Sequence, residues 1–435
     1  PSEGRGGSFG SLAPGGGEGQ GEGERREKLT MNPSEMRDLI PPLGLREYWY
    51  PALPERKVGR RKPTGLKMLG DDLVFFRGKD GRVAALSNAC PHRGGSLMHG
   101  DCHYPGTVAC PYHGWVFDEQ GDCVAVLSEG SESRIPGKVQ ARAYPTRTVK
   151  GLVFVWMGQG TPVPIEEDVP QEFFEGPETL VFHDVKYWPV NWRVALENAL
   201  DSHVMYVHRN ALLQLLEPIF QFGPLGYRPR FVKDRAVIGH LPGDPTKGPS
   251  QEFYPGVNGF WPKHRWRYFW LWMFRWRISR RAKVAPFNPD EEWGMHTMID
   301  GARARSGGHH LPSMFRFNMD TYMYTRCCVP VDLKTTRVVY YHAVRHRTAP
   351  GRLWSTVRFH GFQNWLMNTN FSTQDYRVMA PQRYDTPEKL SGTDAEVIAW
   401  RKLLLRARGM PARVSDLDPD GAEPAGDFEI PTSHS

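Results

Sequence analysis

The sequence predicts an α+β protein, with an all-β domain near its N-terminus followed by a larger domain of mixed helices and strands. Between residues 43 and 156, short apolar runs alternate with turn-forming residues, as is typical of antiparallel β structure. A proline-rich linker at residues 161–164 ends this pattern, and both helical and strand-like patterns follow it. A chain of 435 residues is long enough for each domain to bury its own core.

In chain order, residues 1–40 are expected to form a flexible tail. Roughly the first 30 residues are mostly Gly, Glu, Ser and Arg, which bury too little apolar surface to offset the entropy of ordering. Met31 is one candidate for the functional start of the chain, which the sequence leaves open. We expect the β domain at residues 41–160, the mixed domain at 161–410, and a second polar, proline-rich tail at 411–435.

The β domain should form strands wherever an apolar run is bounded by turn residues. Such runs lie at residues 48–50, 66–69, 73–76, 83–86, 116–117, 123–127 and 151–156. In the second domain, residues 191–208 contain no Gly or Pro and carry apolar side chains at helical intervals, so they predict a helix, with local distortion allowed. Later patterns predict strands at 337–341 and 354–359 and a helix at 395–405.

Composition and charge narrow the class of protein. The net charge of +7 is modest and the basic residues are scattered, so we expect no nucleic-acid partner. The six cysteines do not have the density of a disulfide scaffold, which indicates a reducing compartment. No signal peptide and no apolar stretch of about 20 residues is found, so we expect a cytoplasmic protein.

Four residues in two short stretches form a candidate ligand set: Cys90 and His92, then Cys110 and His113. Two thiolates and two imidazoles suit either zinc or a two-iron cluster. Structural zinc sites usually begin with two cysteines or end with two histidines, whereas here each stretch supplies one of each. This spacing favours a [2Fe-2S] cluster with two Cys on one iron and two His on the other. A structural zinc knuckle is the alternative.

A second candidate metal centre lies on the predicted helix 191–208. It carries Asp201, His203 and His208, and two imidazoles with a carboxylate are the ligands of a mononuclear iron site with open positions. The carboxylate has to come from elsewhere in the chain. Asp375 is the best candidate, because the sequence predicts a polar turn that meets the start of a helix there.

The Cys/His loops resemble those of Rieske proteins. The Glu-Asn-x-x-Asp segment at 197–201, the two histidines after it and the distal Asp375 resemble the α subunits of Rieske non-haem iron aromatic ring-hydroxylating oxygenases. Within that family, residues 191–201 and 398–402 most resemble the carbazole 1,9a-dioxygenase terminal oxygenases. The resemblance covers about residues 43–408. It implies a Rieske domain followed by a helix-grip (START-like) catalytic domain with an antiparallel sheet.

The resemblance also implies roles for the site residues. A mononuclear Fe(II) would be held by His203, His208 and Asp375, and Asp201 would bridge a cluster histidine of one subunit to an iron histidine of the next in a homotrimer. Members of the family usually have two residues between this Asp and the first His, whereas this chain has one. An alignment on Asp201 and His208 puts Val204 at the ligand position; His203 is kept because the helix has no other histidine besides His208.

The sequence has no dinucleotide-binding glycine motif after a strand and no flavin fingerprint. A ferredoxin and an NAD(P)H-dependent ferredoxin reductase would therefore have to supply electrons. Basic side chains near the cluster, namely Lys57, Arg93 and residues 60–62, could steer an acidic ferredoxin, although solvated surface charge is the simpler interpretation of each.

Residues 261–281 are rich in Trp and Arg, and their uncharged centre is too short to span a membrane. We rank an aromatic strand beside the pocket first, an aromatic core or trimer contact second, and membrane contact third. An aromatic wall would suit a small, flat, apolar substrate.

The expected function is the terminal oxygenase of a multicomponent dioxygenase, which uses O2 and electrons from a ferredoxin to dihydroxylate an apolar aromatic or N-heteroaromatic substrate such as carbazole. A Rieske monooxygenase or O- or N-demethylase is one alternative, and a Rieske electron carrier with an inactive second domain is another. Iron content separates the carrier, with about two irons per chain, from the oxygenases, with about three.

Overall fold

The computed structural model describes residues 32–199, 207–208, 211–212, 228–232, 235–240, 307–318, 322–382, 386–391 and 394–410. Within 32–199, ten short strands precede residue 160: β1 Trp49–Pro54, β2 Thr64–Met68, β3 Asp71–Arg77, β4 Val83–Ser87, β5 Thr107–Ala109, β6 Trp115–Asp118, β7 Cys123–Val126, β8 Ala143–Tyr144, β9 Thr146–Val149 and β10 Leu152–Trp156. They form three antiparallel sheets, in the orders β1-β10-β9, β2-β3-β4-β8 and β5-β6-β7. The predicted all-β start is confirmed.

The core of this region is built from apolar runs rather than from strict alternation. Residues Leu73, Val74, Phe75 and Phe76 of β3 are all fully buried, because β3 lies inside its sheet and is covered on both faces. The loops between strands contain the short 3-10 helices Glu55–Lys57, Leu97–His99 and Gly130–Glu132. Two more, Ile165–Glu167 and Gln171–Phe173, lie between this region and the next sheet.

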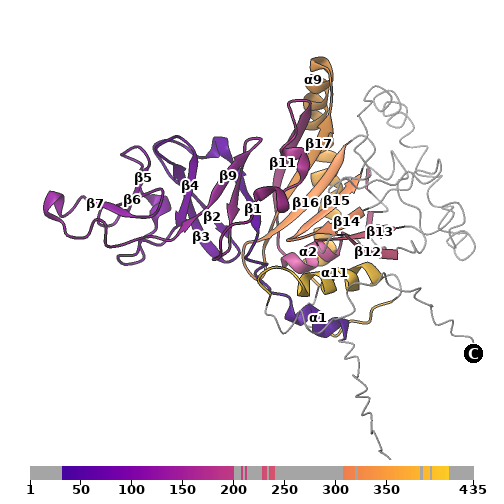
Figure 1. Ribbon diagram of the computed structural model, residues 1–435. Coiled ribbons are helices and arrows are strands. Elements are labelled where there is room, and N and C mark those ends of the chain that lie inside the picture. Colours follow the sequence, from indigo (N-terminus) through magenta and orange to yellow (C-terminus); the bar gives the residue numbers. More distant parts are fainter. Residues whose placement is uncertain are drawn as a thin grey trace, which may run out of the picture. The chain divides into compact units, whose positions relative to one another are not determined.

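Among the described residues of the second region, seven strands form one antiparallel sheet (Figure 1). The strands are β11 Thr179–Trp188, β12 Arg228–Val232, β13 Ala236–His240, β14 Gly307–His310, β15 Met314–Asn318, β16 Met323–Pro330 and β17 Thr336–Arg345. Their order is β11-β17-β16-β15-β14-β13-β12. β11 and β17 pair along ten residues, from Thr179 opposite Arg345 to Trp188 opposite Thr336. The predicted antiparallel sheet and the strand at 337–341 are confirmed.

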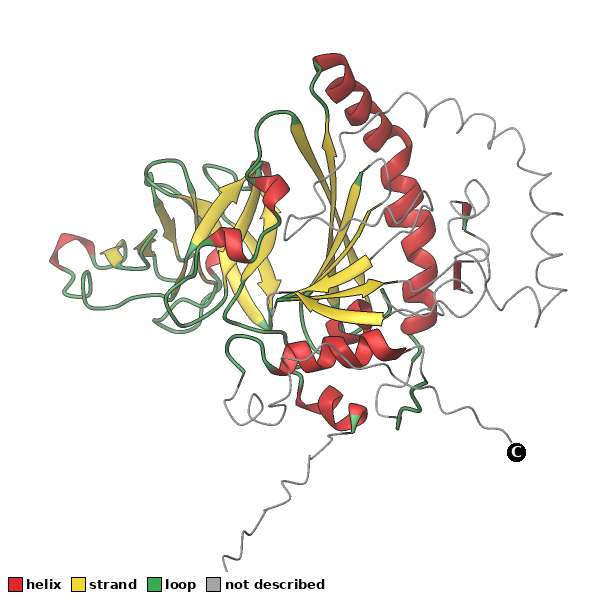
Figure 2. Ribbon diagram, turned by 45° about the vertical axis from the view of Figure 1, so that its right-hand side comes forward, coloured by secondary structure: helices red, strands yellow, loops and turns green. Residues whose placement is uncertain are grey.

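A long helical stretch lies beside this sheet (Figure 2). It consists of α9 Ala349–Arg358, the π-helical segments Phe359–Gln363 and Trp365–Phe371, and α10 Ser372–Met379. The strand predicted at 354–359 is therefore wrong, as is the polar turn before Asp375. Thr348 caps the start of α9, and Leu353 and Val357 are exposed on it. The apolar residues at 354–359 therefore do not form the buried face of a strand.

Three α-helices lie near one end of the sheet: α1 Pro33–Leu39, α2 Trp192–Glu197 and α11 Ala395–Leu405. The terminal helix at 395–405 is confirmed. Helix α2 confirms the predicted helix over residues 192–197, and the chain then turns at 198–199. Residues 200–206 lie outside the described part, so the rest of the predicted helix stays a prediction.

Residues 32–40, which the sequence assigns to the flexible tail, are ordered instead. They form α1, whose start is capped by Asn32 and Glu35, and α1 packs on α11. Ile40 is fully buried. A seven-residue helix gains its stability from packing rather than from its own sequence, so the sequence alone did not predict α1. The low-complexity stretch directly before residue 32 also made these residues look like part of the tail.

Direct hydrogen bonds join the early sheets to the large sheet. The backbone N–H of Leu69 donates to the carbonyl of Pro330 at 2.8 Å, and the guanidinium of buried Arg337 donates to the carbonyls of Pro51 and Ala52. None of the described helices is both long and apolar enough to cross a membrane.

Candidate metal centres

The two predicted cluster loops have the same local geometry. In the first, the N–H of Cys90 donates to the carbonyl of Gly95, and its own carbonyl accepts from Gly94, both at 2.8 Å. In the second, Cys110 N–H donates to Trp115 at 2.7 Å, and Gly114 N–H donates back to the Cys110 carbonyl at 3.1 Å. The loop of Cys110 is the tip of the β5–β6 hairpin. Each loop is thus a tight turn that fixes its cysteine.

The two loops face each other. The rings of His92 and His113 lie 4.7 Å apart, centre to centre. The ring of His92 stacks on Trp115 at 4.6 Å, and that of His113 on Tyr112 at 3.8 Å. Both cysteines are buried, whereas His92 is exposed and His113 half-buried. The thiols therefore point inwards and the imidazoles lie towards the surface.

Space and charge around the thiols fit a bound metal cluster. A side chain at Gly95 would place its Cβ 3.1 Å from the sulfur of Cys110, so glycine leaves room for that sulfur. Burial, together with the neighbouring Cys110 thiol, raises the pKa of the Cys90 thiol to about 11. Two adjacent thiolates need a compensating positive charge, which two iron ions would supply.

The second centre brings together two of the predicted iron ligands. His208 Nε2 lies 3.0 Å from Asp375 Oδ1, although the residues are far apart in the chain, and both side chains are buried. Among the described residues, neither ring nitrogen of His208 nor Oδ1 of Asp375 has a hydrogen-bond partner. Metal–ligand bonds of about 2.1 Å that meet at a right angle hold their ligand atoms about 3.0 Å apart. The pair is thus suited to a shared metal ion.

Each residue of this pair is held by its own segment. Asp375 lies in the first turn of α10, directly after the π-helical segment that ends at Phe371. Such π-helical turns are frequent at functional sites. The ring of His208 stacks on Phe371 at 3.5 Å. The N–H of Leu212 donates to the side chain of Asn370 at 3.0 Å, which fixes the chain just after His208.

Several sequence-predicted residues lie outside the described part of the chain. These are Asp201, His203 and the alternative Val204, as well as the aromatic stretch at 261–281. Within the described residues, no group of three or more His, Cys, Asp or Glu side chains converges on one point.

Two buried residues that the sequence did not single out contact the end of α2. Arg326 on β16 donates to the carbonyl of Ala195 at 2.7 Å, and His309 on β14 hydrogen-bonds to that of Leu196 at 2.7 Å. Arg326 also lies 3.6 Å from Oδ2 of Asp375. The sequence signal for Arg326 is a single arginine within the otherwise uncharged strand Met323–Pro330, because a charged residue in a buried strand needs a specific partner.

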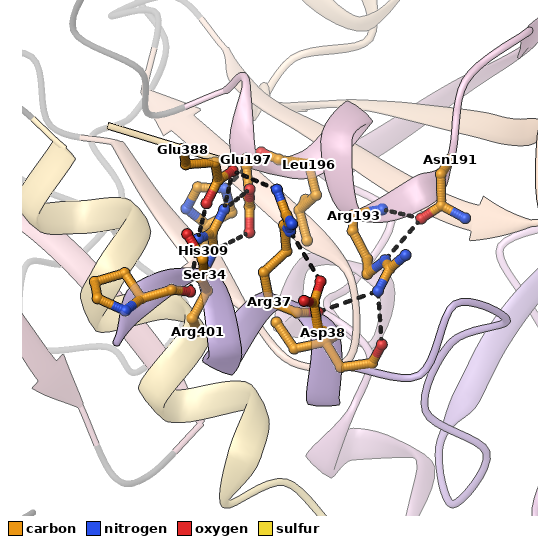
Figure 3. Close-up of polar contacts among 12 residues, drawn as sticks. Ser34, Arg37, Asp38, Asn191, Arg193, Leu196, Glu197, His309, Glu388 and Arg401 are labelled. Carbon is orange, nitrogen blue, oxygen red and sulfur yellow. Dashed lines mark hydrogen bonds and ion pairs between the residues drawn. The ribbon is translucent and has the colours of Figure 1, made fainter. Parts of the chain in front are cut away.

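Another buried arginine, Arg401 on α11, binds the last residue of α2 (Figure 3). Its guanidinium makes two 2.8 Å hydrogen bonds to Glu197 and two more to Glu388, at 2.6 and 2.9 Å. At the start of α2, Arg193 donates to the carbonyls of Arg37 and Ile40. The segment that leads to residues 200–208 is therefore fixed at both ends by buried arginines.

Comparison with known protein families gives two matches. Residues 48–140 match the Rieske [2Fe-2S] domain, and residues 156–244 match the family described as homotrimeric ring hydroxylase. The first match spans both Cys/His loops, and the second contains His208. The predicted Rieske cluster and ring-hydroxylase region are confirmed at the level of the family.

Curated relatives include enzymes of more than one activity. The chain is 31% identical over 189 residues to the terminal oxygenase component of carbazole 1,9a-dioxygenase from Metapseudomonas resinovorans, which is 43% of this chain and 48% of that protein. It is 31% identical over 189 residues to the oxygenase subunit of 5,5'-dehydrodivanillate O-demethylase from Sphingobium sp., covering 42% and 44% of the two chains. The chain thus matches about half the length of these relatives.

Solved structures extend the similarity of fold over most of the chain. The terminal oxygenase of carbazole 1,9a-dioxygenase from Nocardioides aromaticivorans superposes with a TM-score of 0.63 at 20% identity, covering 85% of this chain and 96% of that one. The oxygenase–ferredoxin complex of a carbazole 1,9a-dioxygenase gives 0.65 at 21% identity, covering 88% and 96%. The β-rich start and the catalytic sheet with its long helix therefore have the fold that the sequence predicts.

Proposed function

Since the chain belongs to the Rieske ring-hydroxylating oxygenases, of α-subunit type, we propose that it is the terminal oxygenase of a multicomponent system acting on an apolar aromatic compound. The observation that carries the proposal is the buried pair of His208 and Asp375, whose facing ligand atoms have no hydrogen-bond partner among the described residues.

We assign Cys90 and Cys110 to one iron of the cluster and His92 and His113 to the other. The buried thiols would hold the cluster in the protein, and the more exposed imidazoles would lie on its surface side. A ferredoxin that docks over His92 and His113 would therefore come within short electron-transfer distance. A reductase that uses NAD(P)H would supply that ferredoxin.

For the mononuclear Fe(II), we propose His208 and Asp375 as ligands together with His203. When bound, the cluster would pass single electrons and the mononuclear iron would activate O2 beside the substrate. Asp375 supplies the negative charge of this ligand set, and the stacked ring of Phe371 fixes the plane of the His208 imidazole. Burial of both side chains keeps bulk water away from the ligand atoms themselves.

Two proposals concern the assembly and the domains. The chain would work as a homotrimer in which Asp201 bridges the cluster of one subunit to the mononuclear site of the next. We propose a Rieske domain at 41–160 and a catalytic domain at 161–410. Helix α1, which precedes the Rieske domain in the chain, packs on α11 of the catalytic domain.

The cytoplasm is the proposed location.

Dihydroxylation of a substrate such as carbazole is the preferred reaction, with a monooxygenase or demethylase reaction as the second candidate. The second candidate is supported by the similar identity to an O-demethylase subunit and to a dioxygenase component. The side chains that would surround the substrate decide between the two reactions, because the identity of the metal ligands is the same for both.

Iron analysis tests the proposal. The anaerobically loaded wild type should contain about three irons per chain, and His208→Ala or Asp375→Ala should contain about two with unchanged cluster absorption. His360→Ala, which removes an exposed histidine of the same helical stretch, is the matched control and should keep three. Two irons in the wild type would instead indicate an electron carrier.

Product analysis tests the reaction. The protein would be supplied with a ferredoxin, its reductase, NAD(P)H and O2, and then with carbazole, fluorene, dibenzofuran and methoxy-aromatics. A cis-diol or the product of its ring opening is expected from the fused-ring compounds. Release of formaldehyde from the methoxy-aromatics as the sole reaction would refute dihydroxylation and favour the demethylase.

A further inference from the structure

Arg326 makes two contacts that no other described residue combines. Its Nη2 donates to the carbonyl of Ala195 at 2.7 Å, and its Nη1 lies 3.6 Å from Oδ2 of Asp375. The other oxygen of that carboxylate, Oδ1, lies 3.0 Å from Nε2 of His208. One guanidinium group thus connects the end of α2 to the carboxylate of the candidate iron site.

Burial makes this position demanding. Arg326 is only 3% exposed, and a buried guanidinium is stable only with partners for its charge and its N–H groups. Its Cζ lies 4.9 Å from the ring centre of Trp188, so the aromatic face supports the cation from one side. The side chain is therefore held among Trp188, Ala195 and Asp375, with the Cys328 side chain as a further contact.

We propose that Arg326 is a positioning residue for Asp375, which it holds so that Oδ1 alone is offered to the metal. This inference rests on the proposed function, because it assumes that Asp375 binds iron. The guanidinium lies 3.6 Å from Oδ2, so its positive charge favours a carboxylate that keeps Oδ2 on the arginine side and turns Oδ1 to the metal. A one-oxygen carboxylate leaves one more coordination position free for O2 or substrate.

The planar, forked shape of arginine suits this role better than charge alone. Two nitrogens of one rigid group face two different partners: one donates to Ala195 O, and the other makes a charge contact with Asp375 Oδ2. Lysine has a single nitrogen on a flexible stem and could face one of these partners at a time. Arg326→Lys should therefore show a partial effect and Arg326→Met the full effect.

His309 provides a matched control. It hydrogen-bonds to the next carbonyl of α2, that of Leu196, and its ring stacks on Trp400, but no contact joins it to Asp375 among the described residues. His309→Phe keeps an aromatic ring at this position and leaves the Leu196 carbonyl unpaired. It thus weakens the same helix end as Arg326→Met without touching the candidate ligand.

The test uses the full-length protein with its cluster intact and the mononuclear site emptied by chelation, then titrated with Co(II). Loss of a partner that orients a metal ligand typically costs 10–100-fold in metal affinity. Arg326→Met should lose about this much, and its visible cobalt bands should change shape and intensity as the carboxylate binds through both oxygens. Arg326→Lys should fall between Arg326→Met and the wild type.

Five outcomes decide the matter. Weaker Co(II) binding and altered bands in Arg326→Met, with His309→Phe within about 2-fold of the wild type, support the proposal. Wild-type affinity and bands in Arg326→Met overturn it, and so does tighter binding, which would mean that the guanidinium only repels the metal. Equal losses in Arg326→Met and His309→Phe also overturn it, because a frayed α2 would explain both. A wild type that takes up no Co(II) refutes the proposed function itself.

Discussion

The guanidinium of Arg401 makes two parallel 2.8 Å hydrogen bonds to the carboxylate of Glu197, a residue 204 positions earlier in the chain. Arg401 also donates to Glu388 and to the carbonyl of Pro33. Figure 3 shows this buried group between α1, α2 and the segment before α11. One side chain therefore joins elements from both ends of the chain to the last residue of α2.

Removal of this arginine should destabilise the protein strongly. Arg401→Met leaves the Glu197 carboxylate buried without its partner, and breaking a buried pair in this way costs about 3–5 kcal/mol. Urea unfolding should show the loss as a lower midpoint. Glu197→Gln and the double variant complete a cycle: the two losses should not add, since either one breaks the same interaction. Additive losses would mean that Arg401 acts mainly through Glu388 and Pro33.

The second prediction concerns two glycines at equivalent positions of the cluster loops. Gly94 and Gly114 both have positive φ angles, of 73° and 66°. A Cβ at Gly114 would lie 2.8 Å from the Cβ of Leu127, whereas a Cβ at Gly94 would meet no atom within 4 Å. Gly94→Ala should cost only the left-handed strain of about 1–2 kcal/mol. Gly114→Ala should cost about 1–3 kcal/mol more because the loop must shift.

Cluster absorption and thermal unfolding measure this difference. Gly114→Ala should carry less cluster per chain than Gly94→Ala after identical expression. The double variant Gly114→Ala/Leu127→Ala removes the clash and should recover part of the lost cluster. Equal cluster content in the two single variants would show that the β5–β6 hairpin tip adapts without cost.

The cluster loops were predictable from sequence because their ligands are local. Each turn brings its Cys and His together within a few residues, so the spacing itself carries the chemistry. Arg326 and His309 were not predictable, because their partners on α2 lie 131 and 113 residues away. Only the register of the sheet decides that these side chains meet Ala195 and Leu196. Asp375 was chosen from an expected polar turn before a helix, whereas the structure has π-helical turns that run directly into α10.

The wrong strand at 354–359 has a different cause. Apolar residues in this stretch suggested one buried face, but Trp354 is 40% and Val357 54% exposed on α9. Tertiary contacts and the cap at Thr348 determine the helix there. The long helix then continues through π-helical turns, which have no simple sequence signature. Sequence patterns therefore identified the strands of the early sheets and α11 more reliably than the helix that carries Asp375.

A third prediction uses the buried carboxylate of Glu396 on α11. Burial raises the pKa of Glu396 to about 8, and neither carboxylate oxygen has a hydrogen-bond partner among the described residues. The folded protein therefore holds this proton over a range in which the unfolded chain, with a pKa near 4.5, has released it. Because the folded pKa is raised, stability should fall as pH rises from about 5 to about 8, by on the order of 1 kcal/mol per pH unit.

Glu396→Gln isolates this effect, since an amide cannot ionise in this range. The difference in unfolding free energy between variant and wild type should grow in favour of the variant from pH 5.5 to pH 8. Glu166→Gln removes one exposed carboxylate and controls for the change in net charge. A constant difference across this pH range would show that Glu396 is ionised in the folded protein, with a partner outside the described residues.

A polar network anchors the π-helical stretch that precedes Asp375. The Nε2 of Gln363 lies 2.8 Å from Nδ1 of His342, and Nε2 of His342 lies 3.1 Å from Oδ1 of Asn368. Burial lowers the pKa of His342 to about 4, so the imidazole is neutral above pH 5. A neutral ring satisfies both contacts when Nδ1 accepts from Gln363 and Nε2–H donates to Asn368.

Asn368→Leu should therefore leave the buried His342 N–H unpaired, at a cost of about 1–3 kcal/mol, and should loosen the π-helical turns. Hydrogen–deuterium exchange is the direct readout: peptides within 359–379 should exchange faster, and Asp375 would lose its fixed position. Trp365→Leu, which alters a side chain 49% exposed on the same segment, is the control and should leave exchange unchanged. Helix α10 continues directly from this segment, so the faster exchange should extend to Asp375. If it stops at Phe371, the contact with Arg326 rather than the polar network holds Asp375 in place.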